Sequence, residues 1–110
     1  MSKDKSAILI VGAGAIGRGF IAPYYAKQYD IYFADSDKGL IEKFSTQNSS
    51  YVTAFSVSNG YKLTSVNYQA CFDINNLTTL PQNISYVIFA VGIKHLGVAA
   101  KKIADLCHKN

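Results

Sequence analysis

Three glycines stand close together near the start of the chain. Gly12, Gly14 and Gly17 have the spacing G-x-G-x-x-G, between the apolar run Ala7–Val11 and a segment with apolar residues at helical spacing. A glycine turn that joins a buried strand to a helix can bring backbone N–H groups and the positive end of a helix dipole to an anion. The chemistry that these residues could perform is pyrophosphate binding.

Each glycine in this motif has a separate physical task. Gly12 permits the tight turn off the strand, Gly14 leaves room for a pyrophosphate beside the backbone, and Gly17 lets the helix approach the strand. Asp35 ends the next apolar strand, 21 residues after Gly14, and its carboxylate can accept hydrogen bonds from ribose hydroxyls. Because this charge would repel a 2′-phosphate, the sequence predicts NAD(H) rather than NADP(H). The alternative is a glycine-rich turn with only a packing role.

The predicted cofactor contacts include the motif, its neighbours and the end of a later strand. They are Gly12, Ala13, Gly14, Ala15, Ile16, Gly17, Arg18, Asp35, Val91 and Gly92. Arg18 could meet a phosphate of cofactor or substrate, or be a solvated surface arginine. Gly92 could lie beside the nicotinamide ribose, or be a simple turn. Lys94 and His95 are expected in a solvated loop, and the alternative for Lys94 is a general base or an anchor near the cofactor. No residue is assigned to catalysis or to a metal.

The elements that must position these residues follow an α/β order. Strands are expected at Ala7–Val11, Ile31–Ala34, Gln69–Phe72 and Ser85–Val91, and helices at Ile16–Gln28, from Ser36 or Asp37 to Phe44, and at Leu96–Cys107. Continuous apolar strands of this kind are typical of a parallel sheet that is buried on both faces. Pro23 falls inside the first helix, where a proline is expected to cause a kink.

A hairpin interrupts this plan. Tyr51–Val57 and Tyr61–Val66 are rich in β-branched and aromatic residues, and Asn59 and Gly60 lie between them. An Asn-Gly pair between two such runs is a strong hairpin signal. The sequence therefore predicts a Rossmann-type, doubly wound, mostly parallel sheet with an inserted β-hairpin. Residues 1–110 would form the first half of a dinucleotide-binding domain.

Composition narrows the function classes. The 110 residues suffice for one domain, and the net charge of +4 comes from scattered lysines and one arginine, which does not indicate a nucleic-acid or membrane surface. No apolar run approaches the roughly 20 residues needed to span a bilayer. Cys71 and Cys107 lack metal-ligand or redox spacing, so reduced thiols in a cytoplasmic protein are expected.

A longer stretch, GAGAIGRGFI, resembles the opening of mannitol-1-phosphate 5-dehydrogenases and related long-chain polyol dehydrogenases. YFADSD at the second strand and FAVGIKHLGVAAKKIAD near the end extend the resemblance from Ala7 to about Asp105. The resemblance implies hydride transfer between NAD(H) and a polyol or sugar phosphate, of the mannitol 1-phosphate and fructose 6-phosphate type. Ala15 stands where an asparagine is common in that family.

The resemblance also implies what this sequence lacks. Family members carry their catalytic lysine and substrate-binding residues in a mostly helical C-terminal domain, which nothing here matches. We expect the NAD-binding portion of such an enzyme, inactive by itself. The strand Ser85–Val91 would have an unpaired edge, so self-association through that edge, or through the face left bare by the missing domain, is expected.

Two alternatives remain open at this point. The chain could be a stand-alone module that senses NAD(H) for a partner protein. It could also belong to a different NAD(P) dehydrogenase family with the same first half, such as hydroxyacid or sugar-nucleotide enzymes.

Overall fold

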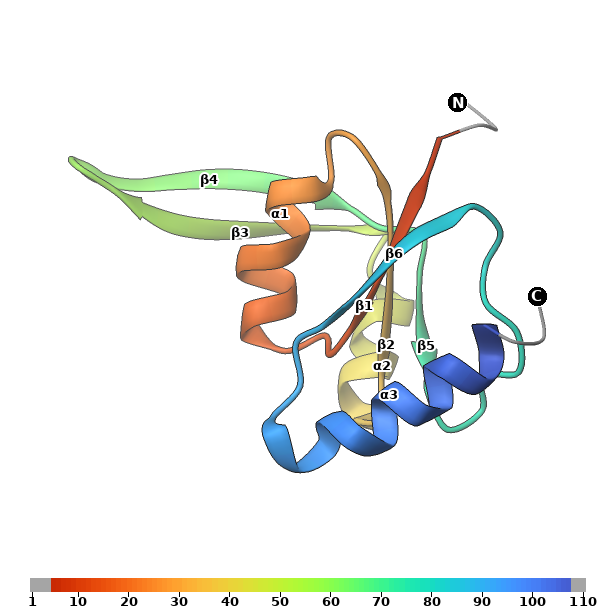
Figure 1. Ribbon diagram of the computed structural model, residues 1–110. Helices are drawn as coiled ribbons and strands as arrows, with labels where there is room; N and C mark the ends of the chain where they lie inside the picture. The colour runs from red at the N-terminus through yellow and green to blue at the C-terminus, as the bar shows by residue number, and fades with distance from the viewer. Residues whose placement is uncertain (1–4, 108–110) are drawn as a thin grey trace.

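A four-stranded parallel sheet forms the centre of the chain in the computed structural model, which describes residues 5–107 (Figure 1). The strands lie in the order β5-β2-β1-β6. Their bounds are β1 (Ala7–Val11), β2 (Asp30–Asp35), β5 (Ala70–Asp73) and β6 (Ile84–Phe89). All three pairings are parallel. This order matches the first four strands of a Rossmann sheet, so the predicted fold class is confirmed.

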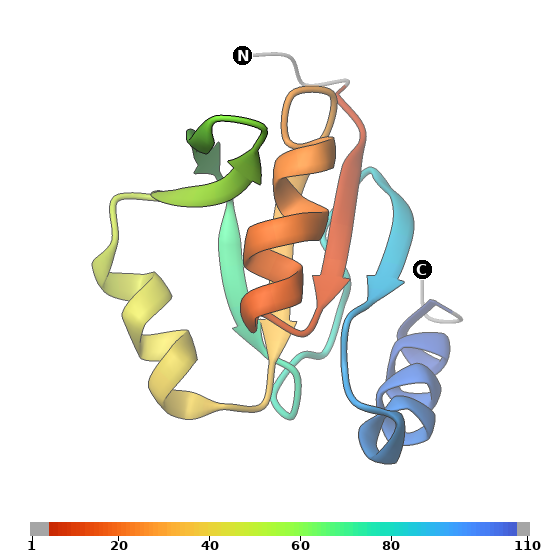
Figure 2. The same ribbon diagram turned by 90° about the vertical axis from the view of Figure 1, so that its left-hand side faces the viewer.

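Helices cover both faces of the sheet, as Figure 2 shows. One face packs against η1 (Gly17–Ile21), α1 (Ala22–Tyr25) and α2 (Lys38–Thr46). The other face packs against α3 (Ile93–Cys107). β1 is buried along its whole length because its apolar side chains alternate between these two cores. The sheet is therefore doubly wound, as predicted.

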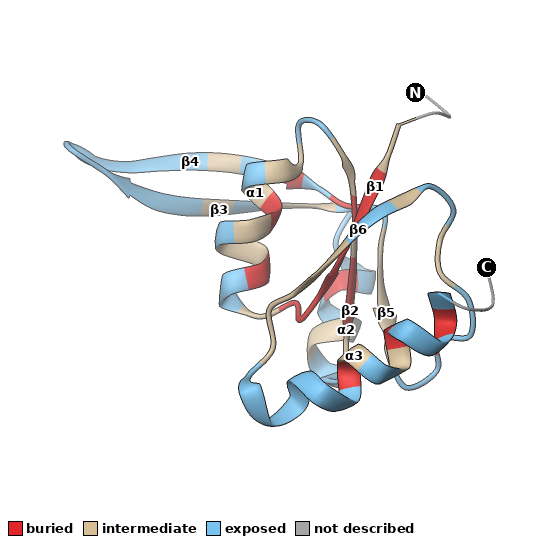
Figure 3. Cartoon of the chain, in the orientation of Figure 1, coloured by how far each residue is buried: buried red, intermediate tan, exposed pale blue. Residues whose placement is uncertain are grey.

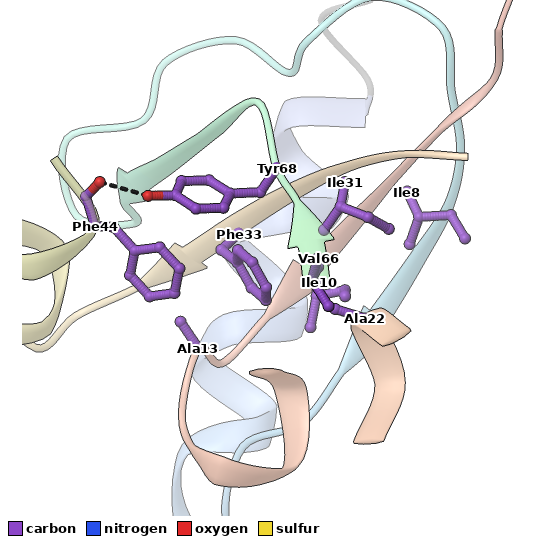
Figure 4. Packing of buried hydrophobic residues seen from close by; sticks show 9 residues of the cluster. All are labelled: Ile8, Ile10, Ala13, Ala22, Ile31, Phe33, Phe44, Val66 and Tyr68. Atoms are coloured by element: carbon purple, nitrogen blue, oxygen red, sulfur yellow. Dashed lines mark hydrogen bonds between the residues drawn. The ribbon is translucent and has the colours of Figure 1, made fainter. Parts of the chain in front are cut away.

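The core on the α1 and α2 face is built around aromatic rings (Figure 4). Phe33 of β2 is fully buried, and its ring centroid lies 5.0 Å from that of Phe44 in α2. Tyr68, which follows the hairpin, packs edge-on against Phe44 and donates its hydroxyl hydrogen to the Phe44 carbonyl oxygen at 2.6 Å. The hydroxyl of this buried tyrosine is thereby satisfied.

The first helical segment differs from its prediction. It ends at Tyr25 rather than Gln28, and its middle, η1, is a π-helical turn in which the Ala22 N–H donates to the Gly17 carbonyl oxygen, five residues back. Pro23 is the second residue of α1, which directly follows the π-helical turn. A wide turn, rather than a proline kink within a continuous α-helix, accommodates Pro23.

The hairpin is present as predicted. β3 (Ser50–Val57) and β4 (Gly60–Asn67) are antiparallel, and Gly60 takes a φ of 131° at the turn. Its tip extends away from the sheet, and Figure 3 shows this outer part as exposed. Its base is held by Val66, which is fully buried in the aromatic core.

Two boundaries near the end of the chain also differ from expectation. β6 ends at Phe89 rather than Val91, and α3 begins at Ile93 rather than Leu96. Lys94 and His95 therefore lie in the first turn of a helix, not in a loop, although both are exposed. Within residues 5–107, β6 pairs only with β1. No helix in this part of the chain has the length and apolar character needed to cross a membrane.

Candidate functional site

A cleft of about 520 Å³ opens at the carboxyl ends of β1, β2 and β6. Its walls are the glycine turn after β1, the end of β2, the loop after β5, the loop after β6 and one side of α3. β1 lies between β2 and β6, so the strand order reverses at this point. In open α/β sheets such a reversal creates a crevice in which ligands bind.

The three glycines of the motif have different surroundings. Gly12 has a φ of 111°, and a Cβ there would lie 2.5 Å from the Ala90 carbonyl oxygen. A Cβ at Gly17 would collide with the carbonyl oxygen of Gly12. Nothing lies within 4 Å of a Cβ built at Gly14, which lines the cleft. Gly12 and Gly17 thus shape the turn, and Gly14 leaves its backbone open to a ligand.

The Asp35 carboxylate joins the end of β2 to the glycine turn. Its Oδ2 accepts a hydrogen bond from the Ala13 N–H at 2.7 Å, and its Oδ1 accepts one from the Asp37 N–H at 2.9 Å. Each carboxylate oxygen can accept more than one hydrogen bond, so both retain capacity for a further donor. Asp37 in turn caps α2, because its Oδ1 accepts from the Leu40 N–H at 3.2 Å. The predicted ribose acceptor therefore also fixes the loop that it faces.

Arg18 folds back on the glycine turn. Its backbone N–H and its Nε both donate to the Gly14 carbonyl oxygen, at 2.9 Å and 3.3 Å. The side chain lines a second, smaller pocket of about 180 Å³ between η1, α2 and β3, which Lys43 also lines. Among the described residues neither cation has a carboxylate within ion-pair distance. Arg18 is thus attached to the turn without lining the cleft itself.

Tyr51, at the base of the hairpin, also reaches this region. Its hydroxyl donates to the Arg18 carbonyl oxygen at 2.7 Å. Burial raises the pKa of the Tyr51 phenol, and the positive charge of Arg18 opposes this rise only in part. The hydroxyl therefore keeps its hydrogen, and remains a donor, at neutral pH.

The cleft brings together half of the predicted contacts. Those that line it are Gly12, Gly14, Asp35, Val91 and Gly92. The other five lie in the turn and the helix behind it: Ala13 and Gly17 are buried, Ala15 and Ile16 are exposed, and Arg18 is half-buried. Whether any of the ten contacts a cofactor stays a prediction.

Sequence reasoning missed two walls of the cleft. His95, Val98 and Lys102 line it from α3, and Ile74 and Asn75 line it from the loop after β5. The three α3 residues recur at intervals of three and four, which places them on one side of a helix. The sequence contains this spacing, but the spacing indicates one side of a helix only if the helix begins before His95. The predicted helix begins at Leu96.

The thiols are free, and one lies near the site. Cys71 of β5 is half-buried, and burial, helped by the negative charge of Asp35, raises the pKa of its thiol to about 12. Cys107 is exposed at the end of α3. Within the described part of the chain, no group of three or more histidine, cysteine, aspartate or glutamate side chains is arranged to hold a metal ion.

Comparison with known proteins agrees with this geometry. Residues 6–110 match the family model for the mannitol dehydrogenase Rossmann domain. The chain is 38% identical over 66 residues to the mannitol-1-phosphate 5-dehydrogenases of two Lactococcus lactis subsp. cremoris strains, MG1363 and SK11. The matched region covers 59% of this chain but only 16% of the length of each relative. The family match spans nearly the whole sequence, and the chain belongs to the mannitol dehydrogenase family through its Rossmann domain.

Proposed function

We propose that the cleft binds NAD(H). We further propose that the chain supplies the NAD-binding part of an oxidoreductase that acts on a CH–OH group of a polyol or sugar phosphate, of the mannitol 1-phosphate and fructose 6-phosphate type. The observation that carries this proposal is the 2.7 Å bond between Ala13 N–H and Asp35. It holds a carboxylate that suits ribose hydroxyls beside Ala13, the residue before Gly14, whose open backbone suits a pyrophosphate.

The remaining cleft residues fit the other parts of a dinucleotide. Ile74 and Val98 offer apolar surface to an adenine ring, and Lys102 adds a positive charge to the same wall. Gly92, which has no atom within 4 Å of a built Cβ, leaves space for the nicotinamide ribose. NAD supplies the hydride acceptor or donor when it is bound. The residues of this chain would bind and orient it, and Asp35 would disfavour a 2′-phosphate.

Turnover is proposed to need residues outside this cleft. The match to the Lactococcus dehydrogenases covers 16% of their length, and residues 6–110 of this chain match the Rossmann domain of the family. We therefore propose that a substrate domain joins this one in the active enzyme. The expected result is that the 110-residue chain binds NADH but does not oxidise it with fructose 6-phosphate. Steady NADH oxidation that depends on fructose 6-phosphate would contradict this part of the proposal.

Calorimetric titration with NADH and, separately, NADPH tests the cofactor assignment. The wild-type chain should bind NADH saturably and NADPH much more weakly. Asp35→Asn should reduce this preference at least about tenfold, because it removes the charge that repels a 2′-phosphate and weakens the ribose acceptor. Absence of NADH binding by the folded wild-type chain would refute the proposal.

Asp73→Asn is the matched control for this experiment. Asp73 is the register partner of Asp35 on the neighbouring strand β5, and its Oδ1 likewise accepts a backbone N–H, from Asn75 at 3.0 Å. The substitution removes the same charge from the same edge of the sheet, but Asp73 does not line the cleft. The preference for NADH should survive in this variant. Loss of preference in both variants would point to net charge rather than to Asp35.

Self-association is proposed through the edge of β6. This strand pairs only with β1 within the described residues, and Tyr86 on it is 57% exposed. An unpaired strand edge offers N–H and C=O groups to another strand. Sedimentation velocity should show a growing dimer fraction as concentration rises. A monomer that persists at high concentration would contradict the proposal.

A further inference from the structure

We propose that Tyr51 is a positioning residue for the glycine turn. From the base of the hairpin, its hydroxyl completes the π-helical turn η1 and thereby holds Arg18 against Gly14. The inference rests on the proposed NAD(H) function of the cleft. It assigns part of that function to the hairpin, whose residues do not line the cleft.

The Arg18 carbonyl oxygen has lost both of the backbone donors that a helix could offer it. In an α-helix the Arg18 carbonyl oxygen would accept from the Ala22 N–H, but that N–H donates to the Gly17 carbonyl oxygen instead. In a π-helix the donor would be the next residue, which is Pro23 and has no N–H. The Tyr51 hydroxyl takes this place, donating to the Arg18 carbonyl oxygen at 2.7 Å. The Tyr51 hydroxyl thus supplies the hydrogen-bond donor that the helix lacks at the Arg18 carbonyl oxygen.

The same residue, Arg18, passes this constraint to the cleft. Its carbonyl is held by Tyr51, and its backbone N–H and Nε both donate to the Gly14 carbonyl oxygen. Gly14 is the motif glycine with open space beside it, where a pyrophosphate would approach. Hydrogen bonds from Tyr51 to Arg18 and from Arg18 to Gly14 therefore join the hairpin to the backbone that would bind phosphate.

The Tyr51 ring is itself fixed in place. Its centroid lies 6.2 Å from that of Phe44 and 6.0 Å from that of Tyr68, within the aromatic core. The next strand residue on the same face, Thr53, also lies against the helix, since a Cβ built at Gly19 would be 3.5 Å from its Oγ1. A ring held on several sides aims its hydroxyl in one direction, as a positioning group must.

Tyr51→Phe is the test, and Tyr68→Phe is a closely matched control. Each change removes one hydroxyl that donates to a helical carbonyl, Arg18 for Tyr51 at 2.7 Å and Phe44 for Tyr68 at 2.6 Å. Both tyrosines belong to the same aromatic cluster, but only the Arg18 carbonyl lies in the motif helix. Tyr51→Phe should weaken NADH binding about fivefold or more, whereas Tyr68→Phe should change it less than about twofold. Urea unfolding should show similar stability losses in the two variants.

A rescue experiment separates positioning from general destabilisation. Pro23→Ala restores an N–H that can donate to the Arg18 carbonyl oxygen. Added to Tyr51→Phe, it should recover at least half of the lost affinity, and added to Tyr68→Phe it should leave NADH binding unchanged. Hydrogen exchange gives a readout without ligand: the Arg18 amide should exchange faster in Tyr51→Phe than in Tyr68→Phe.

The outcomes distinguish the two proposals. If the folded wild-type chain does not bind NADH, the proposed function and the inference that rests on it both fail. If the wild-type chain binds NADH and the two phenylalanine variants bind it equally well, only the role of Tyr51 is refuted. Absence of rescue by Pro23→Ala together with equal exchange of the Arg18 amide would also refute it.

Discussion

Gly17 and Gly14 are only three residues apart, and alanine at each should produce opposite results. A Cβ at Gly17 would collide with the Gly12 carbonyl oxygen and lie 3.3 Å from Ile10 Cγ2. The Gly12 backbone has little freedom to move away, because its N–H donates to the Ala34 carbonyl oxygen at 2.7 Å. The helix must therefore move off the sheet in Gly17→Ala, or the turn must distort.

The expected magnitude follows from two opposing terms. Overpacking against immobile backbone costs up to about 3 kcal/mol, and alanine recovers up to about 1 kcal/mol of helix propensity relative to glycine. Gly17→Ala should therefore lose about 2 kcal/mol of unfolding free energy, or roughly 10 °C in Tm for a domain of this size. Gly14→Ala meets nothing within 4 Å, so its stability should change by less than about 0.5 kcal/mol.

In NADH binding, Gly14→Ala should be impaired for a reason that does not involve stability. The added methyl of Gly14→Ala occupies the space proposed for pyrophosphate, so NADH affinity should fall about tenfold or more in a protein of normal stability. Thermal unfolding by circular dichroism and calorimetric titration with NADH measure the two effects. A Gly17→Ala variant as stable as wild type would refute the packing argument. A Gly14→Ala variant with unchanged affinity would refute the assignment of pyrophosphate to this backbone.

Three further predictions concern the core and the thiols. Phe33→Ala should lose about 3–5 kcal/mol in urea unfolding, because Phe33 is fully buried at the centre of the aromatic core; a loss below about 1 kcal/mol would contradict that position. The urea midpoint of the wild type should fall as pH rises from about 9 towards 12, because the Cys71 thiol ionises near its ordinary value when unfolded but only at about 12 when folded. Cys71→Ala should lessen this fall, and an unchanged slope would exclude the thiol as a contributor. In the native protein iodoacetamide should alkylate the exposed Cys107 well before the half-buried Cys71. Peptide mass spectrometry measures the two rates, and equal rates would contradict the burial of Cys71.

The strands were predictable because their signals are local. Ala7–Val11 is apolar without interruption, and the Asn-Gly pair requires a tight turn, so β1 and the hairpin follow from neighbouring residues alone. Gly12 and Asp35 were also placed correctly at the ends of β1 and β2, because the glycine spacing and the distance to the acid are properties of the chain itself. The wall of the cleft formed by these strand ends was therefore foreseeable.

The parts that escaped prediction depend on contacts between distant residues. The π-helical turn is completed by Tyr51, which is 33 residues away from Arg18. No residue pattern within the helix predicts this contact. The Asp35 carboxylate reaches Ala13 across 22 residues, so its part in fixing the turn was likewise hidden. The start of helix α3 at Ile93 escaped prediction because Ile93 does not continue the buried apolar stripe of the helix, being 88% exposed. Because the predicted helix begins at Leu96, the sequence does not predict the stripe of cleft residues on α3.

The central position of β1 has a consequence for synthesis on the ribosome. β1 is synthesised well before its neighbour β6, because Ala7 pairs with Ile84, 77 residues further along the chain. At translation rates of about 5–20 residues per second, roughly 4–15 s pass before that partner strand exists. During this interval the AILIV segment can pair with β2 but has no neighbour on its other edge. One edge of this apolar strand therefore stays unpaired for seconds during synthesis, and an unpaired edge can pair with another strand.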